Sequence, residues 1–159
     1  MRNHVIKEIS LNALVLALIL ICTIYFIIPT SFGYLNVSDA IILLSVLILK
    51  NKYSCLILAF GCCMSDLYLG FGQYALFTLI IKFLEAFTCR KMLNMNINYY
   101  IVYFIGLMIM LIGYGLTDVI LSSNVTYFSV SLLANLPQAI VCYIIAILLF
   151  KPVNKLNLK

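Results

Sequence analysis

The stretch that decides the fold is residues 9–29, ISLNALVLALILICTIYFIIP, which contains no charged side chain. A helix needs about 20 consecutive apolar residues to cross the hydrocarbon core of a bilayer, and this run is long enough. It follows Arg2 and Lys7, as a signal peptide would. It is, however, longer than the apolar core of a signal peptide, and no small-x-small cleavage site comes after it. We therefore expect a retained membrane-spanning helix over residues 6–28.

The composition of the whole chain agrees with a membrane protein. Of its 159 residues, 65% are hydrophobic and 9% are charged, and the mean hydropathy is +1.17. Soluble domains are about 45–50% apolar and about 25% charged. A small soluble fold also exposes too much surface to hide so many apolar side chains. The composition predicts a protein whose solvent is the lipid bilayer, with no nucleic-acid partner.

Short polar breaks divide the rest of the chain into five further apolar segments. We expect a six-helix, all-α membrane bundle that forms a single substrate-binding domain over residues 1–159. The expected helices are residues 6–28, 37–49, 53–69, 74–88, 99–121 and 129–150. The second, third and fourth are shorter than a full upright span requires. We expect these three to extend into the breaks or to be shielded by loops.

The basic residues predict the orientation of this bundle. Nine of the ten are Arg2, Lys7, Lys50, Lys52, Arg90, Lys91, Lys151, Lys155 and Lys159. In a six-helix topology these nine all fall on one side of the membrane. The loops of the other side, residues 30–36, 70–73 and 122–128, contain no Lys or Arg. Because positively charged segments stay in the cytoplasm, we predict a multi-pass protein of the cell membrane with both termini cytoplasmic.

Ionisable residues inside the expected helices are candidates for function, because a charge at the middle of a helix costs about 2.5–3.5 kcal/mol on insertion scales. They are Asp39, Asp66, Lys82, Glu85 and Asp118. The three aspartates lie near the outer ends of their helices, and Lys82 lies about 12 Å into its helix at 1.5 Å per residue. The set predicts a cavity that opens to the outside. The structural alternative is a first-turn acid for Asp39 and solvated helix ends for the other two aspartates.

One face of the fourth expected helix is polar. Tyr74, Thr78, Lys82 and Glu85 are spaced by four, four and three residues, so they lie on the same side of that helix. We interpret this face as part of the cavity. The structural alternative is an ion pair between Lys82 and Glu85 that joins neighbouring turns.

The last expected helix offers Asn135 and Gln138, which are three residues apart and share a face. Pro137 between them removes one backbone donor and favours a kink that exposes carbonyl groups to a ligand. The structural alternative for the two amides is hydrogen bonding between helices.

The first expected helix has a different feature, because Ala13 and Ala17 give it small-x-x-x-small spacing. That spacing lets another helix approach closely, although ordinary internal packing also uses it. Enzyme motifs are missing: there is no nucleotide-binding loop, G-x-S-x-G or H-E-x-x-H, and Asp66 and Asp118 lack the G-x-G-D of an intramembrane aspartyl protease. The six cysteines form no C-x-x-C pair. We expect no catalytic residue, no metal and no cofactor.

Three segments together resemble the substrate-binding (S) component of an energy-coupling factor (ECF) transporter. Residues 34–40, YLNVSDA, are similar to the family's Y-x-N-x-G-D-A at the start of its second helix. Residues 65–82, SDLYLGFGQYALFTLIIK, are similar to its A-D-L-x-x-G-Y-x-x-Y-A-P-x-T-L-x-I-K-G signature. Residues 135–138, NLPQ, are similar to the N-x-x-Q of its sixth helix. The resemblance covers nearly the whole chain.

The resemblance implies six helices and a vitamin-sized pocket that opens to the outside. The candidate substrate-binding residues are Asp39, Asp66, Tyr74, Thr78, Lys82, Glu85, Asp118, Asn135 and Gln138. The resemblance also implies that Ala13 and Ala17 match the A-x-x-x-A motif of the first helix, which docks on the transmembrane T component. ATP hydrolysis would then belong to two separate ATPase subunits. The implied function is capture of a small vitamin or precursor outside the cell and its delivery through the T component.

The chain departs from the family pattern at a few positions, which leaves the ligand open. Ser38 replaces the usual Gly, Phe77 the usual Pro and Phe83 the Gly after the lysine, and relatives often carry Glu near Asp118. Members of this branch are associated with pyridoxine, the hydroxymethylpyrimidine precursor of thiamin, or riboflavin. All three have a flat heteroaromatic ring with hydroxyl groups. The aromatic residues expected nearby are Tyr34, Tyr74 and Tyr114.

Two other functions remain open at this point. One is a stand-alone secondary transporter that couples to ions through Asp66, Glu85 or Asp118. No internal repeat or pair of broken helices is visible, which counts against it. The other is a membrane assembly factor that binds no ligand.

Overall fold

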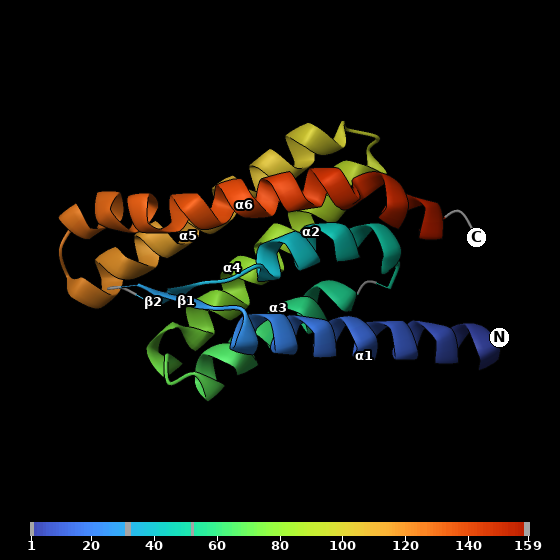
Figure 1. The fold of residues 1–159 in the computed structure, drawn as a ribbon, viewed down its shortest axis with the longest axis horizontal. Helices are drawn as coiled ribbons and strands as arrows, with labels where there is room; N and C mark the ends of the chain where they lie inside the picture. The colour runs from blue at the N-terminus through green and yellow to red at the C-terminus, as the bar shows by residue number, and fades with distance from the viewer. Residues whose placement is uncertain (1, 31–32, 52, 158–159) are drawn as a thin grey trace.

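The computed structural model describes residues 2–30, 33–51 and 53–157, and within these ranges it forms six helices and one short hairpin. The helices are α1 (Arg2–Tyr25), α2 (Ser38–Ile48), α3 (Ser54–Tyr68), α4 (Gly72–Asn94), α5 (Tyr99–Ser122) and α6 (Thr126–Asn157) (Figure 1). The strands are β1 (Ile28–Thr30) and β2 (Gly33–Leu35). The predicted six-helix, all-α membrane bundle is confirmed.

Three of the helices are long and apolar enough to cross a membrane by length and composition. Their spans are Val5–Tyr25, Tyr99–Ser122 and Thr126–Lys155. α4 is similar in length, at 23 residues, and exceeds its predicted range of 74–88 at both ends. It carries Lys82 and Glu85 in its middle, which makes it more polar than the other three. Both side chains are buried inside the bundle, which is how a membrane helix can carry ionisable residues.

α2 is the shortest helix, and the bundle covers it. Its 11 residues reach only about 16 Å, too short to span a bilayer alone. Nine of them are buried, and α2 contacts each of the five other helices. Arg90 of α4 donates to the main-chain carbonyls of Leu49 and Asn51, at 2.6 Å each. It thereby satisfies hydrogen-bond acceptors just after the carboxyl end of α2. The five neighbouring helices therefore shield α2, whereas the prediction assigned this shielding to loops.

The connection from α1 to α2 contains a hairpin, which takes in the predicted end of the first helix at residue 28 and most of the predicted loop 30–36. α1 ends at Tyr25, before the predicted boundary at residue 28, and the chain then turns back so that Pro29 pairs with Tyr34. The residue before a proline is pushed out of the helical region, which explains why Ile28 is extended. The hairpin carries Tyr34 to the end of the bundle at which α2 begins.

α6 is longer than predicted at both ends. It begins at Thr126 and continues to Asn157 through both Pro137 and Pro152, whereas the prediction ended it at residue 150. Proline removes one backbone hydrogen bond, and packing of the neighbouring turns can outweigh that loss. Phe150 stacks on Tyr99 of α5, with 3.7 Å between ring centroids, and this contact holds the last turns in place.

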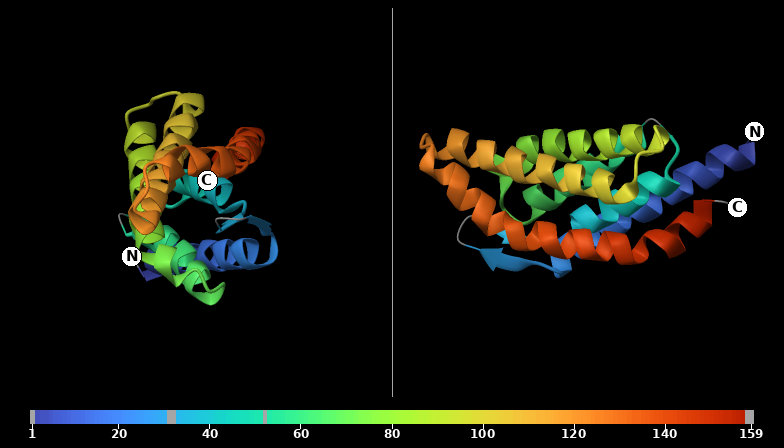
Figure 2. Two further views of the ribbon diagram at one scale, coloured as in Figure 1. Left: turned by 90° about the vertical axis from the view of Figure 1, so that its left-hand side faces the viewer. Right: turned by 90° about the horizontal axis from the view of Figure 1, so that it is seen from above.

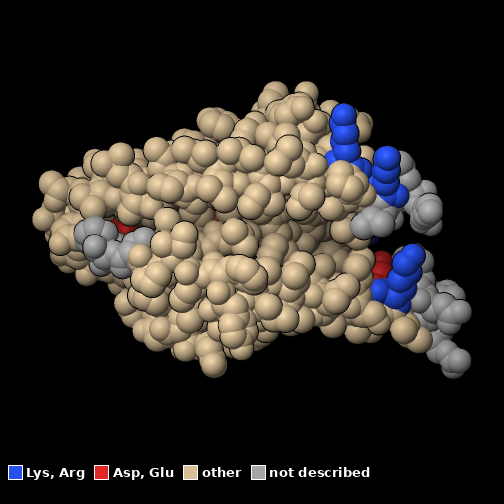
Figure 3. Space-filling model, in the orientation of Figure 1, with Lys and Arg blue, Asp and Glu red and all other residues tan. Residues whose placement is uncertain are grey.

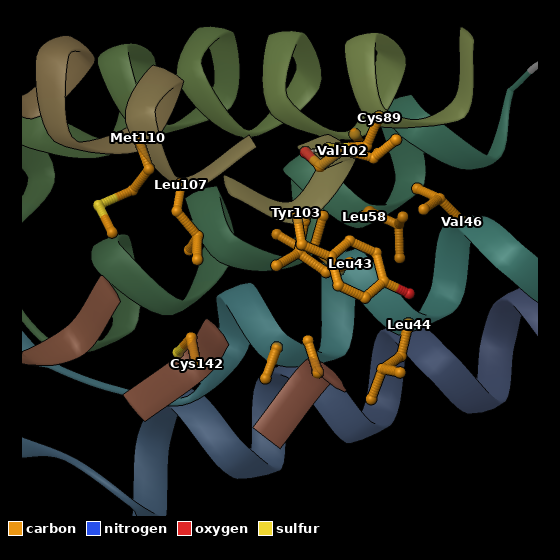
Figure 4. Packing of buried hydrophobic residues seen from close by; sticks show 14 of the residues in the cluster. Leu43, Leu44, Val46, Leu58, Cys89, Val102, Tyr103, Leu107, Met110 and Cys142 are labelled. Carbon is orange, nitrogen blue, oxygen red and sulfur yellow. Dashed lines mark hydrogen bonds between the residues drawn. The ribbon is translucent and has the colours of Figure 1, made fainter. Parts of the chain in front are cut away.

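The apolar core lies around α2, and all six helices contribute buried residues to it (Figure 4). Tyr103 of α5 and Leu43 of α2 are completely buried there. Gly106 lets α5 approach α4 and α2 closely. A Cβ at this position would lie 2.5 Å from Sγ of Cys89 on α4 and 3.0 Å from Cδ2 of Leu43 on α2. All six cysteines are free and five of them are buried, which is typical of thiols that pack as small apolar groups.

Positive charge gathers at one end of the molecule. On the face drawn in Figure 3, Lys and Arg lie at the end where both chain termini are found in Figures 1 and 2. The hairpin and the α3–α4 and α5–α6 connections lie at the other end (Figure 2). This arrangement agrees with the charge pattern of the sequence. That the basic end faces the cytoplasm stays a prediction.

Candidate ligand-binding site

A polar pocket lies at the end of the bundle opposite the termini, where the hairpin meets α3, α4, α5 and α6. It encloses about 50 Å³. Its lining residues are Tyr34, Asn36, Asp66, Phe71, Tyr74, Thr78, Tyr114, Asp118, Ala134, Asn135 and Gln138. Such a concentration of polar groups within an apolar bundle marks a place where a ligand could be bound.

Most of the predicted substrate-binding residues come together in this pocket. Those that line it are Asp66, Tyr74, Thr78, Asp118, Asn135 and Gln138. The other three, Asp39, Lys82 and Glu85, lie outside the lining, one layer deeper in the bundle. That any of the nine binds a ligand stays a prediction.

Sequence reasoning missed three lining residues. Asn36 lies within the segment 34–40 that carried the family resemblance, and its amide could have been noticed there. Phe71 and Ala134 are apolar residues in an apolar sequence, so only the fold reveals that they face the pocket.

Two tyrosine–carboxylate pairs hold the outer part of the pocket. Tyr34 on the hairpin donates its hydroxyl hydrogen to Oδ1 of Asp66 at the end of α3. Burial and the neighbouring Asp66 carboxylate raise the pKa of Tyr34 well above its usual value, so it remains a donor at neutral pH. Tyr74 at the start of α4 donates to Oδ1 of Asp118 near the end of α5, at 2.6 Å. Each pair therefore joins segments that are distant in sequence.

At the inner end of the pocket, Thr78 and Tyr114 lie between the pocket and the buried side chain of Lys82. Thr78 and Tyr114, which both line the pocket, share a hydrogen bond of 3.1 Å. Nζ of Lys82 lies 5.5 Å from the centre of the Tyr114 ring, in a cation–π contact. Lys82 is one turn deeper on α4 than Thr78, and its side chain is only 2% exposed.

Lys82 belongs to a buried charge cluster. Its Nζ donates to Oδ1 of Asp39 on α2 and, at 3.3 Å, to Oε2 of Glu85 one turn along α4. Both carboxylates are completely buried. The ion pair with Glu85 that the sequence suggested is present, and Asp39 forms a second pair. Asp39 also lies in the first turn of α2, where the positive end of the helix dipole favours it.

Three side-chain amides line the side of the pocket formed by α6 and the segment before α2. Gln138 accepts from the main-chain N–H of Asn36, at 2.8 Å, and donates to the buried Asp39. Asn36 accepts from the N–H of Ser38, at 2.7 Å. Asn135 donates to the main-chain carbonyl of Ser131, at 2.9 Å. This network connects the pocket wall to the charge cluster through Gln138.

Ala13 and Ala17 lie away from the pocket, on the surface of α1. Both are exposed, so they do not serve the internal packing that was their alternative interpretation. Ala13 borders an apolar groove of about 590 Å³ between α1 and α3, and Ala17 does not line it. The close contact between these helices uses Gly61, where a Cβ would lie 2.8 Å from Cδ1 of Leu16.

The fold and the pocket together define a helical membrane protein with a polar pocket at one end of its bundle. The chain matches, over residues 3–155, the family described as ECF-type riboflavin transporter, S component. It therefore belongs to this family, whose members are substrate-binding subunits of transporters and not enzymes. No curated protein matches the chain.

Proposed function

We propose that this protein captures a small vitamin outside the cell and delivers it through a transmembrane T component, with riboflavin as the first candidate ligand. Pyridoxine and the hydroxymethylpyrimidine precursor of thiamin are the other candidates. The observation that carries the proposal is the polar pocket at the end opposite the basic residues. If the basic end is cytoplasmic, the pocket opens to the outside.

Binding requires the pocket to widen. A volume of about 50 Å³ holds a few waters, whereas sites for drug-sized ligands occupy about 300–1,000 Å³. The tyrosine–carboxylate pairs are the contacts that a ligand can replace. A ligand hydroxyl that donates to Asp66 or Asp118 takes the place of a tyrosine hydroxyl, so no buried carboxylate loses its donor.

Energy for release belongs to other subunits in this proposal. Two ATPase subunits hydrolyse ATP, and the T component transmits the resulting motion to this chain. Ala13 and Ala17 form the docking surface, since both are exposed on α1 and small residues allow another helix to approach. The whole chain acts as one substrate-binding domain.

The direct test is to purify the protein in detergent and identify what it carries. Mass spectrometry of the extracted ligand should find riboflavin or one of the two alternative vitamins. Titration of ligand-free protein should then give saturable binding with one site per chain. A Tyr74→Phe/Asp118→Leu variant removes one polar pair and should bind more weakly, whereas the surface variant Leu14→Ala should bind normally.

Two results would contradict the proposal. The first is a purified, folded protein that carries and binds none of the three vitamins. The second is ion-driven uptake into liposomes that contain this chain alone, which would favour the stand-alone secondary transporter.

A further inference from the structure

The groove between α1 and α3, of about 590 Å³, shares no lining residue with the polar pocket. Its size is within the range of about 300–1,000 Å³ that is typical of sites for small molecules. Most of its wall is apolar, and these side chains are Val5, Ile9, Ala13, Leu16, Leu56, Ile57, Phe60 and Leu79. A long, apolar groove on the surface of a membrane protein suits the acyl chain of a lipid.

Polar lining residues gather at the basic end of this groove. Glu8 lies near the start of α1, and Asn51 and Tyr53 lie just before the start of α3. The connection from α2 to α3 is at the same end of the molecule as the N-terminus (Figure 1). The groove therefore has a polar mouth and an apolar interior, and a phospholipid divides its polar and apolar parts in the same way.

Two lysines stand beside the mouth of the groove. Lys7 precedes Glu8 and Lys50 precedes Asn51, and both lysines are exposed. Neither has an ion pair with another described residue. The acidic residue of the lining, Glu8, accepts a hydrogen bond from the side chain of Asn51, at 3.4 Å. Two cations beside a single lining carboxylate favour a negatively charged headgroup at the mouth.

Asn12 presents an unused acceptor one turn further into the groove. Its side chain is 8% exposed, and its Nδ2 donates to the main-chain carbonyl of Glu8, at 2.8 Å. A carbonyl can only accept, so this contact determines which way the amide faces. The Oδ1 atom is buried and has no partner among the described residues. Because a buried acceptor without a donor is unfavourable, we expect the occupant of the groove to supply one.

We propose that the groove binds one anionic phospholipid with a hydroxyl-bearing headgroup, of the phosphatidylglycerol type. One acyl chain lies along the apolar wall, the phosphate lies near Lys7 and Lys50, and a headgroup hydroxyl donates to Oδ1 of Asn12. Lys7 and Asn12 are about 7–8 Å apart along α1, a separation that a glycerol phosphate can bridge. A zwitterionic lipid lacks the net charge, and a lipid without a donor leaves Asn12 unpaired. The inference does not depend on the proposed vitamin transport, because the two sites are separate.

The test uses tryptophan as a reporter, because the chain contains none. Phe60→Trp places the reporter in the wall of the groove. Phe104→Trp is the matched control, since Phe104 is also exposed and also lies in the second turn of its helix, and α5 contributes nothing to the groove. Both helices begin at the basic end of the molecule (Figure 1).

The full chain is reconstituted in vesicles of phosphatidylcholine and phosphatidylglycerol, one of which carries brominated acyl chains that quench tryptophan fluorescence. The lipids are then exchanged, so that each is the quencher in turn. Quenching in the Phe60→Trp chain should show about a tenfold preference for phosphatidylglycerol. The Phe104→Trp chain should show almost no preference.

Two comparisons in the Phe60→Trp chain assign the contacts. Lys50→Gln should reduce the preference for phosphatidylglycerol about threefold or more, whereas Lys151→Gln, on α6 at the same end, should not change it. Phosphatidylmethanol has the same charge but no hydroxyl group. The Phe60→Trp chain should bind it about three- to tenfold more weakly than phosphatidylglycerol, and Asn12→Leu should remove this difference.

Equal lipid preference in the Phe60→Trp and Phe104→Trp chains would overturn the lipid site. A Phe60→Trp reporter that no brominated lipid quenches would overturn it too, because a protein surface, either a second copy or a partner helix, then covers the groove. If Asn12→Leu does not fold, equal binding of phosphatidylglycerol and phosphatidylmethanol by the Phe60→Trp chain still refutes the hydroxyl contact. Vitamin binding is measured separately, so none of these results decides the proposed function.

Discussion

Lys82 and Asp39 form an ion pair that joins α4 to α2 in the interior of the bundle, one layer below the pocket. The two residues are 43 positions apart in sequence, and their side chains are almost completely buried. Asp39 also accepts from Gln138, so the pair reaches the pocket wall through one further side chain. Lys82 can therefore influence binding without touching the ligand.

The first prediction is that Lys82→Met destabilises the protein. Removing one partner of a buried ion pair leaves a buried charge unpaired, which costs about 3–5 kcal/mol. Asp39 and Glu85 both lose their positively charged partner here, although Asp39 keeps its hydrogen bond from Gln138. Thermal unfolding in detergent should show a clearly lower midpoint for this variant. Adding Asp39→Asn and Glu85→Gln to Lys82→Met should recover part of the loss, and no recovery would contradict the cluster as described.

The second prediction concerns a phosphorylated ligand. Among the residues that the structure describes, Asp66 and Asp118 are the charged ones that line the pocket, and the nearby Lys82 is paired with Asp39 and Glu85. A phosphate would meet like charge, and two unit charges 4 Å apart repel by about 4 kcal/mol near a protein surface. Riboflavin 5′-phosphate should bind at least about tenfold more weakly than riboflavin.

Asp118→Asn should narrow that difference, because it removes one of the two negative charges while keeping an acceptor for Tyr74. Ser122→Ala is the control, since among the described residues the side-chain hydrogen bonds of Ser122 go only to main-chain atoms of Asp118 and Asn124, and its side chain carries no charge. Fluorescence titration of both flavins against each variant measures the effect. Equal affinities of the wild-type protein for the two flavins would show that the carboxylates do not select against charge.

The third prediction is that bulky residues at Ala13 or Ala17 prevent docking on the T component. Ala13→Leu and Ala17→Leu should reduce vitamin uptake in cells and co-purification of the partner subunits by about tenfold or more, because a larger side chain blocks close helix approach. Ligand binding to the isolated subunit should be unchanged, since both positions are remote from the pocket. Leu14→Phe adds bulk to an exposed neighbouring position and should have no effect. If the partner subunits co-purify normally with Ala13→Leu and Ala17→Leu, the docking surface lies elsewhere.

The fourth prediction is the orientation in the membrane. Reporters fused to the two ends of the chain should both be active on the cytoplasmic side, because the basic residues gather there. A reporter inserted at Asn124, between α5 and α6, should be active outside the cell. A terminal reporter that is active outside would refute the topology and would also place the pocket on the wrong side for uptake.

The sequence determined the features that depend on local composition. Hydropathy is a property of each segment by itself, so the six helices could be found from apolar runs separated by polar breaks. The positions of the basic residues predicted a common end for both termini, and Figures 1 and 3 agree with it. Residues 34–40, 65–82 and 135–138 carried a resemblance that the match over residues 3–155 confirms. The approximate position of the polar residues along each helix followed from helix geometry.

The tertiary structure alone decided which polar residues meet. Nothing local shows that Lys82 pairs with Asp39, or that Gln138 contacts the backbone of Asn36, 102 positions earlier. Packing likewise overrode local signals where α6 continues through Pro152. An ionisable side chain in a membrane must find a partner, but the sequence does not say which one, because the choice depends on how helices distant in sequence are placed side by side.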